Sequence, residues 1–223
     1  MKAMKIRIAS ILLGVLASFQ IGESFSQPFY NDIVKFRKAD SVQAPPAKPI
    51  LFIGSSSFTY WKDLADSFSD YPVLNRAFGG SSLTHLIQYA EEVVFRYDPR
   101  QIVVYCGEND LATDSKVDGD SVYQRFRRLY LMIRKRFPKV PVVYVSMKPS
   151  PSRESLMPKM RQGNEKIRRM MGKRRIDSYV DVYSRMLGPD GKPMPDIFLA
   201  DRLHMNRKGY EIWQPLIEEK LVR

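Results

Sequence analysis

Cysteine and histidine are scarce in this chain of 223 residues, which has one cysteine and two histidines. The single cysteine, Cys106, excludes an intrachain disulfide framework, so packing must stabilise the fold. Cys106 follows an apolar run, as a core residue does, which speaks against a nucleophilic thiol. The histidines, His85 and His204, belong to no His/Cys/carboxylate cluster with zinc-like spacing, so we expect neither a metal nor another cofactor.

Long apolar runs are also missing, apart from a short one near the N-terminus. Three basic residues precede the apolar segment 8–19, and Ser24 and Ser26 stand three and one positions before Gln27. This pattern predicts a secretory signal peptide over 1–26 and export to the periplasm or the extracellular space. The apolar run is too short to favour a membrane span, and an uncleaved anchor is the alternative.

Positive charge exceeds negative charge, giving a formal net charge of +12 at pH 7. Much of the excess lies in the segments 125–128, 134–136 and 166–175. Solvated helix faces are the simpler interpretation, and attraction to an anionic polysaccharide or lipid surface is the functional one. No DNA- or RNA-binding motif is present, so we expect no nucleic-acid partner. The sequence carries no signal for the oligomeric state.

Strand-like and helix-like patterns alternate along the chain from residue 50 onward. A short helix at 30–40 and a Pro-rich link make up 27–49, before a single domain over 50–223. Alternation with connections of this length predicts a three-layer α/β domain around a parallel sheet of about five strands. The expected strands, rich in β-branched residues, are 50–53, 73–76, 102–105, 140–146 and 179–182. The expected helices include apolar stripes over 83–94, 122–133 and 210–221.

The residues that follow the predicted strands carry the chemistry, because ligands bind beyond the carboxyl ends of parallel strands. Gly-Ser-Ser-Ser occupies 54–57, Ala-Phe-Gly-Gly occupies 77–80 and Gly-Glu-Asn-Asp occupies 107–110. After a long loop, Asp-Arg-Leu-His occupies 201–204. Serines, glycines, an amide and an acid–histidine pair therefore converge on one edge of the sheet.

Three adjacent serines, Ser55, Ser56 and Ser57, are candidate nucleophiles at this edge. A serine hydroxyl needs a base that takes its proton and donors that hold the oxyanion of a tetrahedral intermediate. A turn from strand into helix would expose Ser56 and aim its backbone N–H at the oxyanion. Spacing alone leaves the other two serines open, and capping of the next helix is the structural alternative for all three.

Gly80 and Asn109 are candidate oxyanion donors. Gly80 can bring its backbone N–H close to a substrate because no side chain stands in the way. Asn109 offers a side-chain amide. A turn glycine and a loop or capping asparagine are the structural alternatives.

His204 is the expected general base, with Asp201 three residues before it to hold the tautomer of the imidazole. The same imidazole would protonate a leaving alcohol. His85 is the only other histidine. It belongs to a helical stripe and follows no carboxylate at close spacing, so it is the weaker candidate.

These blocks resemble those of the SGNH (GDSL-type) hydrolases. The segments 51–56, 75–80, 107–110 and 201–204 are similar to four sequence blocks of that family, in the same order. Each block is short, but the ordered set is specific and spans most of the chain. The resemblance implies a flavodoxin-like three-layer fold, in agreement with the alternation of strands and helices.

The resemblance also implies roles for five residues. Ser56 corresponds to the nucleophile, and its N–H forms the oxyanion hole with Gly80 and Asn109. Asp201 and His204 correspond to the acid–base pair.

Two positions depart from the family pattern. Ser55 stands where an acidic residue is usual, and Ala77 stands where glycine is frequent. Neither change removes a catalytic group. Trp61 and the Gly79–Gly80 pair are also similar to the platelet-activating-factor acetylhydrolase-like branch, which implies short acyl groups.

The sequence as a whole predicts an exported serine esterase that hydrolyses short-chain acyl or acetyl esters through an acyl-Ser56 intermediate. Its substrate would be a small-molecule, carbohydrate or lipid ester. An acyltransferase, or a non-catalytic carbohydrate- or lipid-binding protein on the same fold, is the alternative. Phe58, Trp61 and Phe78 are candidate walls of the acyl pocket, with ordinary core as the alternative. The loop 183–200 is expected to border the pocket.

Overall fold

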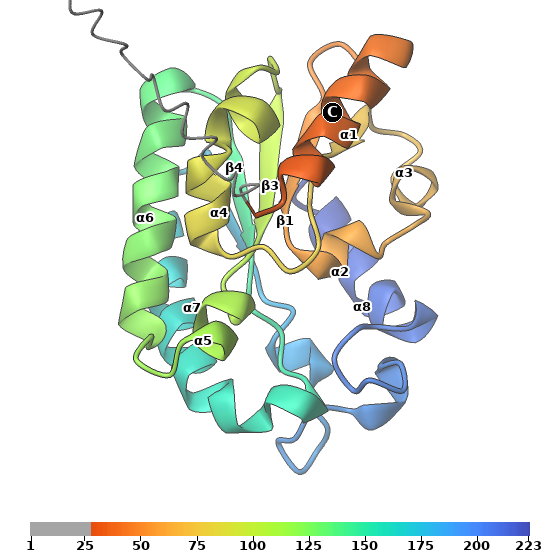
Figure 1. The fold of residues 1–223 in the computed structure, drawn as a ribbon. Coiled ribbons are helices and arrows are strands. Elements are labelled where there is room, and N and C mark those ends of the chain that lie inside the picture. Colours follow the sequence, from red (N-terminus) through yellow and green to blue (C-terminus); the bar gives the residue numbers. More distant parts are fainter. Residues whose placement is uncertain (1–27) are drawn as a thin grey trace, which may run out of the picture.

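A parallel sheet of five strands forms the centre of the structure, a computed structural model that describes residues 28–223 (Figure 1). The signal peptide predicted over 1–26 lies outside the described residues. Neighbouring strands pair in the order β2-β1-β3-β4-β5, which is the strand order of flavodoxin-like folds. The strands are β1 (Ile50–Gly54), β2 (Val73–Asn75), β3 (Gln101–Tyr105), β4 (Val142–Val145) and β5 (Ser178–Val180).

The three central strands β1, β3 and β4 are buried on both faces, as their apolar sequences predict. Successive side chains point to opposite faces, so Leu51 and Ile53 enter one core while Ile50 and Phe52 enter the other. The three-layer α/β architecture and all five predicted strands are therefore confirmed, with ends shifted by one or two residues.

Helices cover both faces of this sheet. One core receives side chains from α1 (Tyr30–Val42), α4 (Leu83–Gln88), α6 (Gly119–Arg136) and α7 (Met157–Met171). The other receives side chains from α2 (Ser56–Thr59), α3 (Leu64–Ser67) and α8 (Arg207–Glu218). The helix α5 (Glu108–Thr113) follows β3. The remaining turns are η1 (Glu91–Phe95), η2 (Pro151–Leu156), η3 (Ser184–Met186) and η4 (Pro195–Ile197).

The apolar stripe over 83–94 differs from the single regular helix that it predicts. The α-helix α4 ends at Gln88, and η1 is a π-helical turn. Val93 and Val94, which are adjacent in the chain, are both completely buried. The local widening of the helix accompanies this double burial and shows how core packing overrides the regular period.

The N-terminal helix α1 is tied to the sheet by a partly buried polar network. Asp40 pairs with Arg76, which follows β2, and accepts a hydrogen bond of 2.7 Å from the Tyr97 hydroxyl. Arg76 Nε donates to the same hydroxyl at 2.6 Å. Since every member has a charged or hydrogen-bonding partner, the network fixes α1 against the domain instead of leaving it as a loose extension.

The basic segments 125–128 and 134–136 lie on α6 and 166–171 lies on α7, as the helix-face interpretation predicts, whereas 172–175 follows the end of α7. Several of these charges are paired within the fold. Arg125 contacts Asp110 at 2.8 Å, and Lys166 contacts Asp120 at 2.5 Å. Attraction to an anionic surface stays a prediction.

The closest approach of α6 and α7 occurs at two glycines and generates a stability prediction. A Cβ on Gly119 would lie 2.4 Å from the Lys159 carbonyl oxygen and 2.5 Å from the Gly163 nitrogen. Because these are backbone atoms, Gly119→Ala should force the helices apart and lower the free energy of unfolding by about 1–3 kcal/mol. Urea denaturation measures this change.

Gly172→Ala, at the end of α7, is the matched control. Its added Cβ would meet its nearest neighbour, the Arg168 carbonyl oxygen, at 3.5 Å, an ordinary contact. We expect its stability to stay within about 0.5 kcal/mol of the parent. Equal stability of the two variants would contradict the packing argument.

Candidate active site

The ends of β1 and β3 meet where Gly54 leaves the sheet. Gly54 has a φ of 146°, and a Cβ there would lie 1.9 Å from the Tyr105 carbonyl oxygen. Only glycine therefore fits. The next residue, Ser55, donates its N–H to that same oxygen at 3.0 Å. The chain then turns into α2 between the two strands at which the strand order reverses, the place where open α/β sheets bind ligands.

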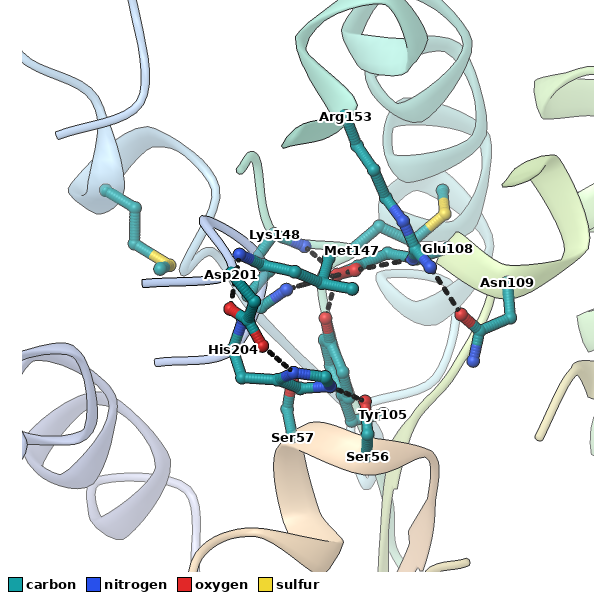
Figure 2. A network of polar contacts seen from close by, with 12 residues as sticks. Ser56, Ser57, Tyr105, Glu108, Asn109, Met147, Lys148, Arg153, Asp201 and His204 are labelled. Atoms are coloured by element: carbon teal, nitrogen blue, oxygen red, sulfur yellow. Dashed lines mark hydrogen bonds and ion pairs between the residues drawn. The ribbon is translucent and has the colours of Figure 1, made fainter. Parts of the chain in front are cut away.

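The three serines of this turn differ in exposure. Ser55 and Ser57 retain only 4% and 3% of their exposed surface, whereas Ser56 is half-buried. Ser56 Oγ lies 3.1 Å from His204 Nε2 (Figure 2). The structure therefore brings Ser56, and neither neighbour, into hydrogen-bond contact with the histidine.

The second ring nitrogen of the imidazole, Nδ1, contacts Asp201. His204 Nδ1 lies 2.6 Å from Asp201 Oδ2, while Asp201 Oδ1 accepts the backbone N–H groups of Leu203 and His204, each at 2.9 Å. Desolvation acts to raise the pKa of Asp201, but the hydrogen bonds from Leu203 and His204 prevail and lower it to about 2. The ionised carboxylate favours the tautomer with a proton on Nδ1, which leaves Nε2 free to accept the serine proton.

The turn that carries Asp201 and His204 is fixed on both sides. Arg202 adopts a φ of 58°, and Leu199 donates its N–H to the His204 carbonyl at 2.8 Å. Asn206 follows and caps α8 by accepting the N–H of Lys208 at 3.0 Å. The acid and the histidine are thus positioned on a short turn before a helix, as the sequence predicts.

Ser81, the residue after Gly80, links the glycine turn to both Gly54 and Asn109. Ser81 Oγ donates to the Gly54 carbonyl at 3.0 Å, and Asn109 Nδ2 donates to the Ser81 carbonyl at 2.9 Å. Gly80 is exposed with a φ of 80°, and within the described residues its N–H makes no hydrogen bond. The serine turn, the glycine turn and the asparagine helix are therefore held together, with the Gly80 N–H available to a ligand.

A buried charged cluster behind Asn109 is a feature that sequence reasoning missed. Glu108 lies 3.1 Å from Lys148 Nζ and 3.2 Å from Arg153 Nη1, and it accepts a hydrogen bond from the Tyr105 hydroxyl. Burial acts to raise the pKa of Glu108, but Lys148 and Arg153 outweigh it and lower the pKa. Arg153 Nη2 also donates to Asn109 Oδ1 at 2.8 Å (Figure 2). Glu108 is therefore held ionised within the cluster.

His85 and Cys106, the other histidine and the single cysteine, lie outside the arrangement of Ser56, His204 and Asp201. His85 Nδ1 accepts the Ser82 N–H at 3.1 Å and completes the cap of α4, and burial lowers its pKa. Cys106 is buried, and burial raises the pKa of its thiol well above the usual value. His85 therefore has a structural role, and the Cys106 thiol is held protonated.

The three aromatic residues considered as pocket walls belong to the cores. Phe58, Trp61 and Phe78 expose 0%, 2% and 1% of their surface, so the ordinary-core interpretation is confirmed. The exposed aromatic residue next to the imidazole is instead Tyr60, with 47% exposure, and Leu199, 50% exposed, bonds the His204 backbone. The Tyr60 ring meets the His204 ring edge-on, with centroids 4.6 Å apart.

No cluster of three or more histidine, cysteine or carboxylate side chains suited to a metal occurs among residues 28–223. Over the same range, no helix has the length and apolar character needed to cross a membrane.

Comparison with known proteins shows the family. Residues 51–212 match the model of the GDSL-like lipase/acylhydrolase family, and the chain belongs to this family of ester-hydrolysing serine hydrolases. The predicted resemblance of the chain to the GDSL-type hydrolases is thereby confirmed. A comparison with curated proteins gives no match.

Several solved structures share the fold at low sequence identity. A Streptococcus pneumonia protein provisionally named a platelet activating factor is 18% identical, with a TM-score of 0.74 over 86% of this chain and 92% of that one. A GDSL-like lipase from Bacteroides thetaiotaomicron is 20% identical, with a TM-score of 0.72 over 84% and 95%. An acetyl-xylooligosaccharide esterase variant from Geobacillus is 14% identical, with a TM-score of 0.63 over 79% and 95%.

The geometry predicts that Ser56→Ala folds normally but loses hydrolysis of p-nitrophenyl acetate by on the order of 10³-fold or more. The reason is that Ser56 is the hydroxyl in contact with His204. Steady-state rates, with circular dichroism to verify folding, measure this loss.

Ser55→Ala and Ser57→Ala are the comparison variants. Both should keep more than about a tenth of the parental rate, because their hydroxyls are buried away from the histidine. Retained activity in Ser56→Ala, together with loss of activity in Ser55→Ala or Ser57→Ala, would contradict the assignment of Ser56 as the nucleophile.

Proposed function

We propose that this protein hydrolyses short-chain acyl esters, in particular acetyl esters of carbohydrate-like alcohols, through an acyl-Ser56 intermediate. The observation that carries the proposal is the continuous hydrogen-bonded line from Asp201 through His204 to Ser56, at 2.6 and 3.1 Å. This arrangement is what a serine nucleophile requires for activation by a histidine base.

In the proposed acylation step, His204 Nε2 takes the proton of Ser56 as Oγ attacks the ester carbonyl carbon. The carbonyl oxygen becomes an oxyanion and is held by the backbone N–H groups of Ser56 and Gly80 and the side-chain N–H of Asn109. The intermediate then collapses, the bond to the alcohol oxygen breaks, and His204 returns its proton to that oxygen.

In the proposed deacylation step, a water molecule replaces the alcohol. His204 takes a proton from the water, whose oxygen attacks the acyl carbon, and the same three donors hold the second oxyanion. Collapse breaks the bond to Ser56 Oγ, which recovers its proton from His204. The carboxylic acid is released and the serine is regenerated.

Closed packing around the serine turn supports a small acyl group. Phe58 packs against Trp213 and Tyr105, and Trp61 packs against Tyr210, with ring centroids between 4.8 and 6.2 Å apart. Because these rings fill the core below the turn, they leave no apolar tunnel among themselves for a long chain. This favours acetyl over fatty acyl groups.

Exposed apolar surface beside His204 supports a ring-shaped alcohol. His204 would protonate the leaving oxygen, so the alcohol must sit on the side of the imidazole. The Tyr60 ring lies there and is about half exposed. Leu199 is also about half exposed and is joined to His204 through the backbone. An aromatic face and an aliphatic side chain suit the apolar face of a sugar ring. Carbohydrate esterases also occur among the proteins that share this fold.

Acyl-chain profiling tests this proposal. We expect kcat/KM for p-nitrophenyl acetate to exceed that for the octanoate by at least about tenfold, because a longer chain gains no buried contact. An acetylated xylo-oligosaccharide should release acetate, and Tyr60→Ala should raise its KM more than that of p-nitrophenyl acetate. A preference for long chains would contradict the proposed acyl group, and inactivity on all esters would favour the binding alternative.

We further propose that the protein is exported, on the basis of the signal-like pattern in residues 1–26. Expression of the full chain with a C-terminal tag should yield a mature protein whose N-terminus, determined by mass spectrometry, is Gln27. The mature form should appear outside the cytoplasm. An intact N-terminus in a membrane fraction would instead indicate an uncleaved anchor.

A further inference from the structure

Arg153 connects the buried charged cluster to the proposed oxyanion site. It lies on η2, between β4 and α7, and only 16% of its side chain is exposed. One arm of its guanidinium, Nη1, donates to Glu108 at 3.2 Å, and the other, Nη2, donates to Asn109 Oδ1 at 2.8 Å (Figure 2). A cation therefore bonds the amide oxygen of the side chain whose nitrogen is a proposed oxyanion donor.

These contacts define the orientation of the Asn109 amide. A guanidinium has donors only, so the atom that it contacts must be the amide oxygen. The Ser81 carbonyl is an acceptor only, so its partner at 2.9 Å must be the amide nitrogen. The amide nitrogen carries two hydrogens, and Ser81 accepts one. The other is left for a ligand, and a flipped amide would lose both bonds.

The charge of Arg153 also affects the strength of the remaining donor. A cationic hydrogen bond to an amide oxygen draws electron density from the nitrogen, which makes its N–H groups stronger donors. This gain is largest when the acceptor is an oxyanion, which exists fully only near the transition state. Asn109 is 9% exposed, so water weakens the effect little.

Lys148 pairs with Glu108 independently of Arg153. Lys148 is 1% exposed and contacts both carboxylate oxygens of Glu108, at 3.1 and 3.3 Å. Glu108 thus has a second basic partner besides Arg153. Of the two cations that contact Glu108, Arg153 is the one that also contacts Asn109.

We propose that Arg153 is a positioning residue for ester hydrolysis, which orients and polarises the Asn109 amide so that its free N–H holds the oxyanion. This inference rests on the proposed function. A purely structural role, in which Arg153 only ties η2 to α5, predicts different behaviour in a double-mutant cycle.

The cycle combines Arg153→Met with Asn109→Ala. In the parent, Arg153→Met should lower kcat for p-nitrophenyl acetate by about tenfold with little change in KM, since the donor is weakened but not removed. In the Asn109→Ala background, the same substitution should change kcat by less than about twofold, because its target is gone. Arg161→Met, which removes a cation that bonds the Tyr183 hydroxyl at 3.3 Å, is the charge-matched control and should keep the parental kcat.

Three results would overturn the inference. They are equal fold-losses of kcat in the two backgrounds, a rise in KM at constant kcat, and full activity of Arg153→Met. If Arg153→Met does not fold, Arg153→Lys is used. It keeps a cation beside Glu108 but cannot bond Glu108 and Asn109 with one fork, so its kcat should fall as well. Full activity of Arg153→Lys would then overturn the inference.

Failure of the proposed function is distinguishable from failure of this inference. A parent protein that is inactive on every ester, and is indistinguishable from Ser56→Ala, would overturn both. An active parent with additive behaviour in the cycle would overturn the role of Arg153 alone.

Discussion

The contact between Gly54 and the Tyr105 carbonyl is the constraint on which the site depends. No side chain fits between the ends of β1 and β3, so the two strands close on each other at the sheet edge. This closure places the turn of Ser56 next to the start of α5, which carries Asn109. The position of the nucleophile relative to Asn109 is thus set by the sheet itself, whereas loops contribute Gly80, the acid and the histidine.

Much of the fold was predictable because its signals are local. Short β-branched runs gave the strands, and connection length gave a parallel sheet with helices on both faces. The same logic predicted Ser56, Gly80 and Asn109 as site residues, since each lies in the segment that follows a strand. The division of the segment 83–94 into α4 and the π-helical turn η1 was not predictable. It depends on the burial of both Val93 and Val94 in the core, which the spacing of apolar residues does not indicate.

The charged cluster behind Asn109 shows where sequence reasoning ends. Arg153 lies 44 residues from Asn109, in a short turn with no recognisable pattern. A glutamate is expected to be buried only when cations pair with it. Nothing in the sequence indicates which of the 36 basic residues pair with Glu108. Such contacts arise from the packing of β4, η2 and α5, and no local sequence pattern indicates them. The choice among three serines likewise required burial and distance, or the family resemblance.

Phe29 gives the position of the proposed signal-peptide cleavage a consequence for the site. Its ring lies 5.2 Å from that of Phe78 and 4.7 Å from that of His85, and it is the nearest side chain to Gly80. The predicted cleavage ahead of Gln27 falls two residues before this ring. Processing at that position would keep this ring beside Gly80, whereas processing a few residues further along the chain would remove it.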